Sequence, residues 1–330
     1  MFKKSAAVFA ALCCLVAYNV HSYADVKGKS LIRFETIPAP SLEKNLLGDP
    51  ATRDIVVYLP PSYFSSKKHY PVVYYLHGYY DTHNRFHDYL PAITAEMKKD
   101  KLREYIIVVP DCLNRLMGSF YVNSPVTGNW ETFITVDLIS HIDKTYRTIP
   151  AAGSRGLAGF SMGGFGTVNL ALRHPDIYSV MFAVSPGLFA PDGLNQALSC
   201  GLWDLAFKQA YGAAFAPDPS LEDPFAGIPE DGTSAKDKEI LKKWENGFGN
   251  VKIKLDEYIA RKEKLRAIRI DYGRSDMYPW IINGCEHFSK MLTAGGIQHE
   301  FHTFEGGHEI YEETAVKELA PFFSRNLIFE

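Results

Sequence analysis

The chain has 330 residues, of which 46% are hydrophobic and 22% are charged, and this globular composition excludes disordered, collagen-like and coiled-coil proteins. A net charge of -3 leaves no basic surplus to neutralise phosphates, which argues against a nucleic-acid binder. Five cysteines in a chain of this length exclude a disulfide scaffold.

Residues 1–24 are predicted to be a secretory signal peptide. Two lysines precede an apolar run at 5–16, and Ser22 and Ala24 are small residues at positions -3 and -1 of a cleavage site after Ala24. An uncleaved anchor is the alternative, but the apolar run is too short to span a bilayer. Cys13 lacks the small residue that precedes a lipidated cysteine, which disfavours a lipoprotein. We therefore expect a secreted or periplasmic protein without stable membrane insertion.

The rest of the chain, 25–330, is predicted to be a single domain. Short apolar runs bounded by Gly, Pro, Ser or Asp predict strands at 54–59, 70–76, 105–109, 156–160, 180–184, 267–272 and 299–304. Helical periodicity lies between them, at 133–146, after the glycines at 163–166, and at 281–292. Apolar strands alternating with helices predict an α/β fold with a mainly parallel sheet covered on both faces. Of the three cysteines that follow the signal peptide, at most one pair forms a disulfide, and the candidates are Cys112, Cys200 and Cys285.

One segment, about 188–265, is too long for a single crossover between strands. Its aromatic residues recur at a helical spacing of four, at Trp203, Phe207, Tyr211 and Phe215. Insertions of this length in compact domains usually act as lids or binding loops. The alternative is a surface insertion without a function.

The sequence GFSMGG at 159–164 matches the pattern G-x-S-x-G, with an apolar strand before it and a helical pattern after it. A sharp turn from strand to helix lifts a serine hydroxyl clear of the sheet, and small flanking residues let the strand and the helix approach each other. Ser161 is therefore the predicted nucleophile, against the alternative of an incidental serine in a glycine-rich turn.

A serine nucleophile needs a base, and the base needs a carboxylate that fixes its tautomer. His308 follows Gly306 and Gly307 just after a predicted strand, and Asp276 follows another, so these two are the predicted base and acid. The chain order Ser, Asp, His is that of the α/β-hydrolases. The rivals are less well placed, because Asp271, His299 and His302 lie inside strands and His77 sits in a loop position that is more often structural.

An oxyanion hole requires two backbone N–H donors directed at the tetrahedral oxygen. Met162 directly follows the nucleophile and is the first predicted donor. The second is expected in the loop after Leu76, at Tyr79.

The motifs YPVVYYLHG, GFSMGG, GRSD and GGH, with VVYLPPSY and PVTGNWETF, resemble the esterase D-type "putative esterase" family of α/β-hydrolases over about residues 50–325. The family includes feruloyl and acetylxylan esterases, tributyrin-type esterases, S-formylglutathione hydrolases, enterochelin esterases and mycolyltransferases. The resemblance implies the α/β-hydrolase fold and the same assignments as above, with Ser161, Asp276 and His308 as the triad and Met162 and Tyr79 as oxyanion donors. Two features depart from the family: Asp137 stands where relatives often have Glu, and the segment 188–265 does not align. The resemblance therefore supports the chemistry more than the substrate.

Three functions compete. The first is a secreted serine carboxylic ester hydrolase that needs no cofactor and no metal, since G-x-G-x-x-G, Walker A and H-E-x-x-H motifs are absent from the sequence. The second is an acyltransferase of the mycolyltransferase type, in which a sugar hydroxyl replaces water. The third is a binding protein on an inactive hydrolase fold, which the three triad candidates disfavour. A cluster of acidic residues and histidines could suggest a metal but is better explained as the solvated rim of the active-site loop: Asp81, His83, His87 and Asp88.

Aromatic residues are expected to surround the nucleophile, on loops at the sheet edge where α/β folds bind ligands. They are Tyr79, Tyr80, Tyr121, Trp130, Tyr278 and Trp280. Flat rings suit sugar or aromatic groups better than a long lipid chain. We therefore predict short-chain or aromatic acyl esters of saccharides as substrates. The alternative is that half of these rings simply complete the core.

Overall fold

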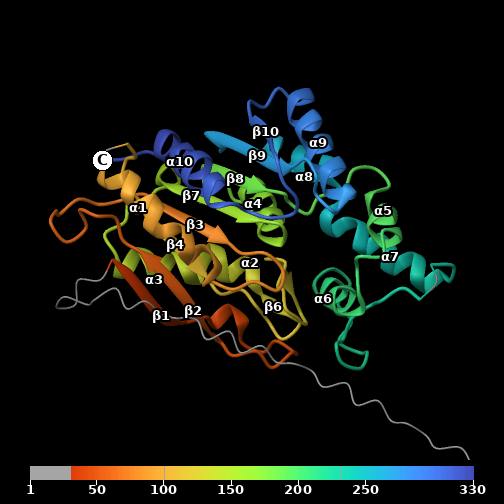
Figure 1. Ribbon diagram of the computed structural model, residues 1–330. Helices are drawn as coiled ribbons and strands as arrows, with labels where there is room; N and C mark the ends of the chain where they lie inside the picture. The colour runs from red at the N-terminus through yellow and green to blue at the C-terminus, as the bar shows by residue number, and fades with distance from the viewer. Residues whose placement is uncertain (1–30, 100, 231) are drawn as a thin grey trace, which may run out of the picture. The chain divides into compact units, whose positions relative to one another are not determined.

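The computed structural model describes residues 31–99, 101–230 and 232–330 (Figure 1). Within these ranges Leu31–Glu330 form one compact unit. The predicted signal peptide, residues 1–24, lies outside the described residues. None of the described helices combines the length and the apolar character that a membrane crossing requires.

Eight strands of the described chain form one twisted sheet in the order β1-β2-β4-β3-β7-β8-β9-β10 (Figure 1). β1 pairs antiparallel with β2 and β2 antiparallel with β4, whereas every other pair is parallel. The strands are β1 (Ile32–Pro38), β2 (Thr52–Tyr58), β3 (Val72–Leu76), β4 (Ile106–Pro110), β7 (Arg155–Phe160), β8 (Val180–Val184), β9 (Ala267–Gly273) and β10 (Glu300–Phe304). A separate small hairpin joins β5 (Asn123–Ser124) to β6 (Gly128–Asn129). Because β3, β7, β8, β9 and β10 are parallel, the loops at their carboxyl ends meet at one edge of the sheet.

The central strands are buried on both faces. Along β3, Val72 and Tyr74 belong to one apolar cluster, and Val73 and Tyr75 belong to another on the opposite face. This alternation follows from the two-residue repeat of a strand. Helices α1 and α10 cover the face of Val73, and α3, α4, α8 and α9 cover the face of Val72.

The helices are α1 (Leu90–Lys98), α2 (Trp130–Thr132), α3 (Leu138–Thr145), α4 (Met162–Arg173), α5 (Gly193–Ser199), α6 (Leu205–Phe215), α7 (Ala235–Phe248), α8 (Val251–Ala260), α9 (Pro279–Ala294) and α10 (Ala320–Asn326). A π-helical turn at Phe133–Asp137 joins α2 to α3, and another at Thr314–Leu319 leads into α10. Short 3-10 turns lie at Pro40–Leu42, Arg85–Tyr89 and Ala152–Ser154.

All seven predicted strands are confirmed, with ends that differ by a few residues. β1 was not predicted from the sequence, because most of its residues remain partly or fully exposed and give no apolar run. The three cysteines that follow the predicted leader are free thiols, with Cys112 and Cys285 buried and Cys200 partly exposed.

The segment 188–265, called the insertion below, carries α5 to α8 between β8 and β9. Its interior is an aromatic cluster fixed by three hydrogen bonds. The Tyr211 hydroxyl donates to the Trp244 carbonyl at 2.9 Å and accepts from the Phe248 N–H at 2.9 Å, and the Trp244 indole N–H donates to the Gly227 carbonyl at 3.1 Å. These bonds join α6 to α7, so the two helices hold their aromatic side chains in one arrangement.

Candidate active site

Ser161 occupies the turn between β7 and α4. Its backbone has φ 56° and ψ −114°, in the left-handed region that costs a non-glycine residue about 1–3 kcal/mol. Glycines make the turn possible: a Cβ on Gly159 would lie 2.3 Å from the Gly163 carbonyl oxygen, and one on Gly163 would lie 2.0 Å from the Leu76 carbonyl oxygen. These glycines therefore allow β7, α4 and the end of β3 to pack closely, with Ser161 at the tip of the turn.

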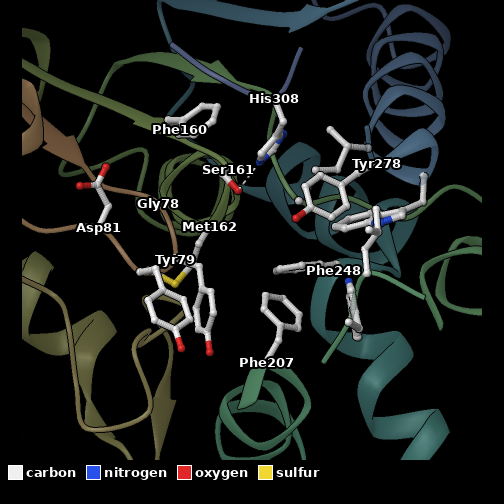
Figure 2. A pocket seen from close by; sticks show the side chains of 16 residues that line it. Gly78, Tyr79, Asp81, Phe160, Ser161, Met162, Phe207, Phe248, Tyr278 and His308 are labelled. Carbon is white, nitrogen blue, oxygen red and sulfur yellow. Dashed lines mark hydrogen bonds between the residues drawn. The ribbon is translucent and has the colours of Figure 1, made fainter. Parts of the chain in front are cut away.

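His308 and Asp276 reach Ser161 from the loops after β10 and β9. His308 Nε2 lies 2.8 Å from Ser161 Oγ, and His308 Nδ1 lies 2.7 Å from Asp276 Oδ2 (Figure 2). The other oxygen, Asp276 Oδ1, accepts the Tyr278 N–H at 2.9 Å. The Asp276 carboxylate is fully buried, whereas the His308 side chain is 13% exposed.

Close backbone packing holds these two loops together. A Cβ on Gly273 would lie 2.2 Å from the Gly307 carbonyl oxygen, and the Ser275 N–H donates to the Gly306 carbonyl at 2.9 Å. Gly306 has φ 147°, a conformation that favours glycine. Gly273 and Gly306 are thus required where the loops cross, whereas a Cβ on Gly307 would lie 3.6 Å from the Ser275 carbonyl oxygen, an ordinary contact.

The rival residues have other partners. Asp271 accepts two hydrogen bonds from the buried Arg269 guanidinium, each 2.8 Å long. His77 is fully buried, where its Nε2 accepts the Cys112 N–H at 2.8 Å and its Nδ1 lies 2.9 Å from the Gly78 carbonyl oxygen. Burial lowers the pKa of His77, so this imidazole is held neutral as a structural link between loops. His299 pairs with Ser289 Oγ at 2.7 Å, and His302 is an exposed residue of β10.

The loop after β3 brings Tyr79 next to Met162 in the same pocket as Ser161. Met162 begins α4, where N–H groups have no intrahelical acceptor. The Tyr80 N–H donates to the Met117 carbonyl at 3.0 Å, and the Tyr121 hydroxyl donates to the His77 carbonyl at 2.8 Å. These bonds fix the loop on both sides of Tyr79.

Ser161 opens into a pocket of about 310 Å³ (Figure 2). Half of the 16 residues that line it are aromatic, namely Tyr79, Tyr80, Phe160, Trp203, Phe207, Phe248, Tyr278 and Trp280. The rings of Phe248 and Trp280 are stacked with centroids 5.8 Å apart, and the Tyr278 ring meets the His308 ring edge to face at 4.8 Å. The walls suit a flat or short apolar group.

Two predicted rim residues do not reach this pocket, and that part of the prediction is wrong. Tyr121 is fully buried, with its ring against Gly166 of α4. Trp130 is also fully buried: its indole N–H donates to the Thr127 carbonyl at 2.7 Å, and the Arg53 guanidinium lies 4.8 Å from its ring centroid. Both follow the third predicted strand, but their side chains turn into the core.

The insertion supplies pocket residues that sequence reasoning did not assign to the site. Trp203 lies two residues before α6, Phe207 lies in the first turn of α6, and Phe248 ends α7. The spacing of four from Trp203 to Phe215 predicted the helix but could not show which of its rings face Ser161. Among the acidic and histidine cluster, Asp81 lines the pocket, while His83 Nδ1 lies 3.3 Å from Asp111.

Comparison with known proteins gives consistent results. Esterase Rv1288 of Mycobacterium tuberculosis (strain H37Rv) is 29% identical over 274 residues, which cover 76% of this chain and 51% of that protein. The chain thus spans about half the length of the curated relatives it matches. A solved ferulic acid esterase superposes with TM-score 0.64 at 22% identity over 90% of this chain and 98% of its own. An S-formylglutathione hydrolase from Agrobacterium tumefaciens superposes with TM-score 0.60 at 16% identity over 90% and 95%.

These superpositions confirm the predicted α/β-hydrolase fold. The family model described as "Putative esterase" matches residues 50–312, which include Ser161, Asp276 and His308. The chain belongs to this esterase family.

Proposed function

We propose that the protein is a serine carboxylic ester hydrolase that works through an acyl-enzyme. The observation that carries the proposal is the hydrogen-bonded chain from Ser161 Oγ through His308 to Asp276, at 2.8 and 2.7 Å, open to a pocket. A nucleophile, a base within hydrogen-bond reach and a carboxylate that orients the base form the arrangement required for acyl transfer.

In the proposed reaction, Ser161 Oγ bonds to the ester carbonyl carbon while its proton passes to His308 Nε2. Asp276 accepts the Nδ1–H and stabilises the imidazolium that forms. The carbonyl oxygen becomes an oxyanion facing the N–H groups of Met162 and Tyr79. The tetrahedral intermediate then collapses: the bond to the alcohol oxygen breaks, the alcohol leaves with the proton from His308, and an acyl ester remains on Ser161. In the second half of the reaction, water attacks the acyl carbonyl while His308 takes its proton, and collapse returns that proton to Ser161 Oγ and releases the acid.

The aromatic pocket supports short or aromatic acyl groups as substrates. A volume of about 310 Å³ fits a compact acyl group, and the stacked rings of Phe248 and Trp280 offer flat walls rather than a tunnel for a long chain. We propose saccharides as the alcohol part, which agrees with the leader predicted at residues 1–24 because exported enzymes meet polymeric esters.

A fluorophosphonate and an activated ester test the proposal. The wild-type protein should bind one phosphonate per chain at Ser161 and release a burst of p-nitrophenol from p-nitrophenyl acetate, because acylation precedes slower hydrolysis. Ser161→Ala should show neither, with an unchanged melting temperature. Labelling of Ser161→Ala at the wild-type rate would overturn the proposal, and adding a sugar acceptor would distinguish transfer from hydrolysis.

A further inference from the structure

The pocket has two chemically different sides around Ser161. Figure 2 shows Asp81 on one side of Ser161 and Phe207, Phe248 and Tyr278 on the other. An ester bound at Ser161 must extend both its acyl part and its alcohol part away from the reacting carbonyl. The aromatic side suits an apolar acyl group, so the side of Asp81 remains for the alcohol.

Hydrogen bonds hold Asp81 in place, but within the described residues one of its two carboxylate oxygens has no partner. Its Oδ1 accepts the Thr82 N–H at 2.9 Å, and its own N–H donates to the Gly78 carbonyl at 3.2 Å. Within residues 31–99, 101–230 and 232–330, Oδ2 has no hydrogen-bond partner and the carboxylate has no ion pair. A rigid carboxylate with a free oxygen in a substrate pocket is ready to accept a hydrogen bond from a ligand.

The Asp81 carboxylate is partly shielded from water. Burial raises the pKa of the Asp81 carboxyl, and the Thr82 N–H and the charges of His77 and Arg85 offset part of that effect. In the part of the chain that the structure describes, neither His77 nor Arg85 forms an ion pair with Asp81, and the carboxylate near His77 Nε2 is Asp111, at 3.8 Å. A partly desolvated carboxylate favours hydroxyl donors and repels other anions.

We propose that Asp81 forms the alcohol-side subsite of the pocket and selects esters of neutral, hydroxyl-rich alcohols over esters of anionic alcohols. The inference rests on the proposed ester hydrolysis. The adjacent Tyr80, 59% exposed and lining the same pocket, adds an aromatic face on which a sugar ring can stack. Asp81 and Tyr80 both belong to the loop after β3. In this proposal that loop recognises the alcohol, and the insertion contacts the acyl group.

Three feruloyl esters that differ only in the alcohol test this assignment: methyl ferulate, a feruloyl ester of arabinose, and feruloylquinate, whose alcohol carries a carboxylate. For Asp81→Ala, kcat/KM should fall about tenfold or more on the arabinose ester, because a hydrogen bond to a charged group is lost. The loss on methyl ferulate should be at least fivefold smaller. Asp81→Asn should lose less on the arabinose ester and should gain on feruloylquinate, because an amide still accepts a hydrogen bond but no longer repels the anion.

Asp88→Asn is the matched control, since it removes the same charge from an exposed position on the neighbouring helical turn and should leave all three rates unchanged. Equal losses on the three esters would overturn the inference and make Asp81 a support of the loop after β3. If the wild-type protein hydrolysed neither the three feruloyl esters nor p-nitrophenyl acetate, the proposed function itself would fail. The two failures are therefore distinguishable.

Discussion

Ser161, Asp276 and His308 lie in loops that directly follow parallel strands, whereas the facing pocket wall comes from helices α6 and α7 of the insertion. The first region is fixed by backbone contacts, such as the Ser275 N–H on the Gly306 carbonyl and the close approach of Gly163 to Leu76. The second is fixed by aromatic side chains packed on one another. The positions of the reacting groups therefore depend on the sheet, and side chains of the pocket wall can be replaced with little effect on them.

Two buried carboxylates, Asp271 in β9 and Asp276 just after it, should respond most strongly to substitution. Asp276→Asn should lower kcat by roughly 10⁴-fold, because an amide no longer fixes the His308 tautomer in which Nδ1 carries the proton. The melting temperature should change little, since the replacement keeps the size of the side chain. Steady-state kinetics on p-nitrophenyl acetate with a folded variant would measure this loss.

Asp271→Asn provides the contrast within the same strand and loop. It breaks the two hydrogen bonds between the carboxylate and the buried Arg269. Breaking a buried pair costs about 3–5 kcal/mol when the charge is left alone, and the cost is lower here because Glu318 and Glu300 remain at 2.6 and 3.3 Å from Arg269. The free energy of unfolding in urea should fall, while kcat of the folded fraction stays near wild type. The opposite ranking of the two variants would show that Asp271, not Asp276, serves His308.

The sequence predicted the first region well for a physical reason. Parallel strands end at the same edge of a sheet, so the positions of Ser161, Asp276 and His308 at three strand ends imply their meeting at that edge. The triad roles of these residues stay predictions, which the kinetics above test. β1 escaped prediction because the polar residues Arg33, Glu35 and Thr36 interrupt its apolar residues, so that this edge strand shows no apolar run.

The pocket wall was harder to predict, because position after a strand does not fix the direction of a side chain. Trp130 starts α2 and packs on Arg53, and Tyr121 packs on Gly166, although both were expected at the rim. Phe248 ends a charged helix of the insertion and gave no signal of its own. In a chain with 13% aromatic residues, the ring type alone does not separate core from pocket.

A second prediction tests whether an aromatic residue belongs to the core or to the pocket. Trp130→Ala should lower the free energy of unfolding by about 3–5 kcal/mol, because it opens a cavity in the core and removes the face that Arg53 covers. KM of the folded protein should not change. Denaturant unfolding and KM for methyl ferulate would be measured together, and a raised KM with unchanged stability would restore Trp130 to the rim.

A third prediction concerns the insertion. Phe248→Leu keeps an apolar side chain at the end of α7 but removes the ring that stacks on Trp280. The preference for methyl ferulate over p-nitrophenyl acetate, as a ratio of kcat/KM values, should fall about two- to tenfold, since an aromatic contact with the acyl group contributes about 0.5–1.5 kcal/mol beyond its buried area. An unchanged ratio would mean that the acyl group does not contact the insertion.

The weakest effect should come from Tyr121, which links the loop after β3 to α4 beside Ser161. Its hydroxyl donates to the His77 carbonyl at 2.8 Å, and its ring rests on Gly166 of α4, so it ties the loop that carries Tyr79 to the helix that follows Ser161. Tyr121→Phe keeps the ring and deletes one hydrogen bond, which contributes about 0.5–1.5 kcal/mol. If that bond positions the Tyr79 N–H for the oxyanion, kcat should fall a few-fold while KM for p-nitrophenyl acetate stays constant, because the loss is confined to the transition state. Tyr178→Phe is the matched control, since its buried hydroxyl donates to the Ile134 carbonyl at 3.0 Å and should affect only the melting temperature. Equal kcat values for the two variants would reduce Tyr121 to a core residue without a role in placing Tyr79.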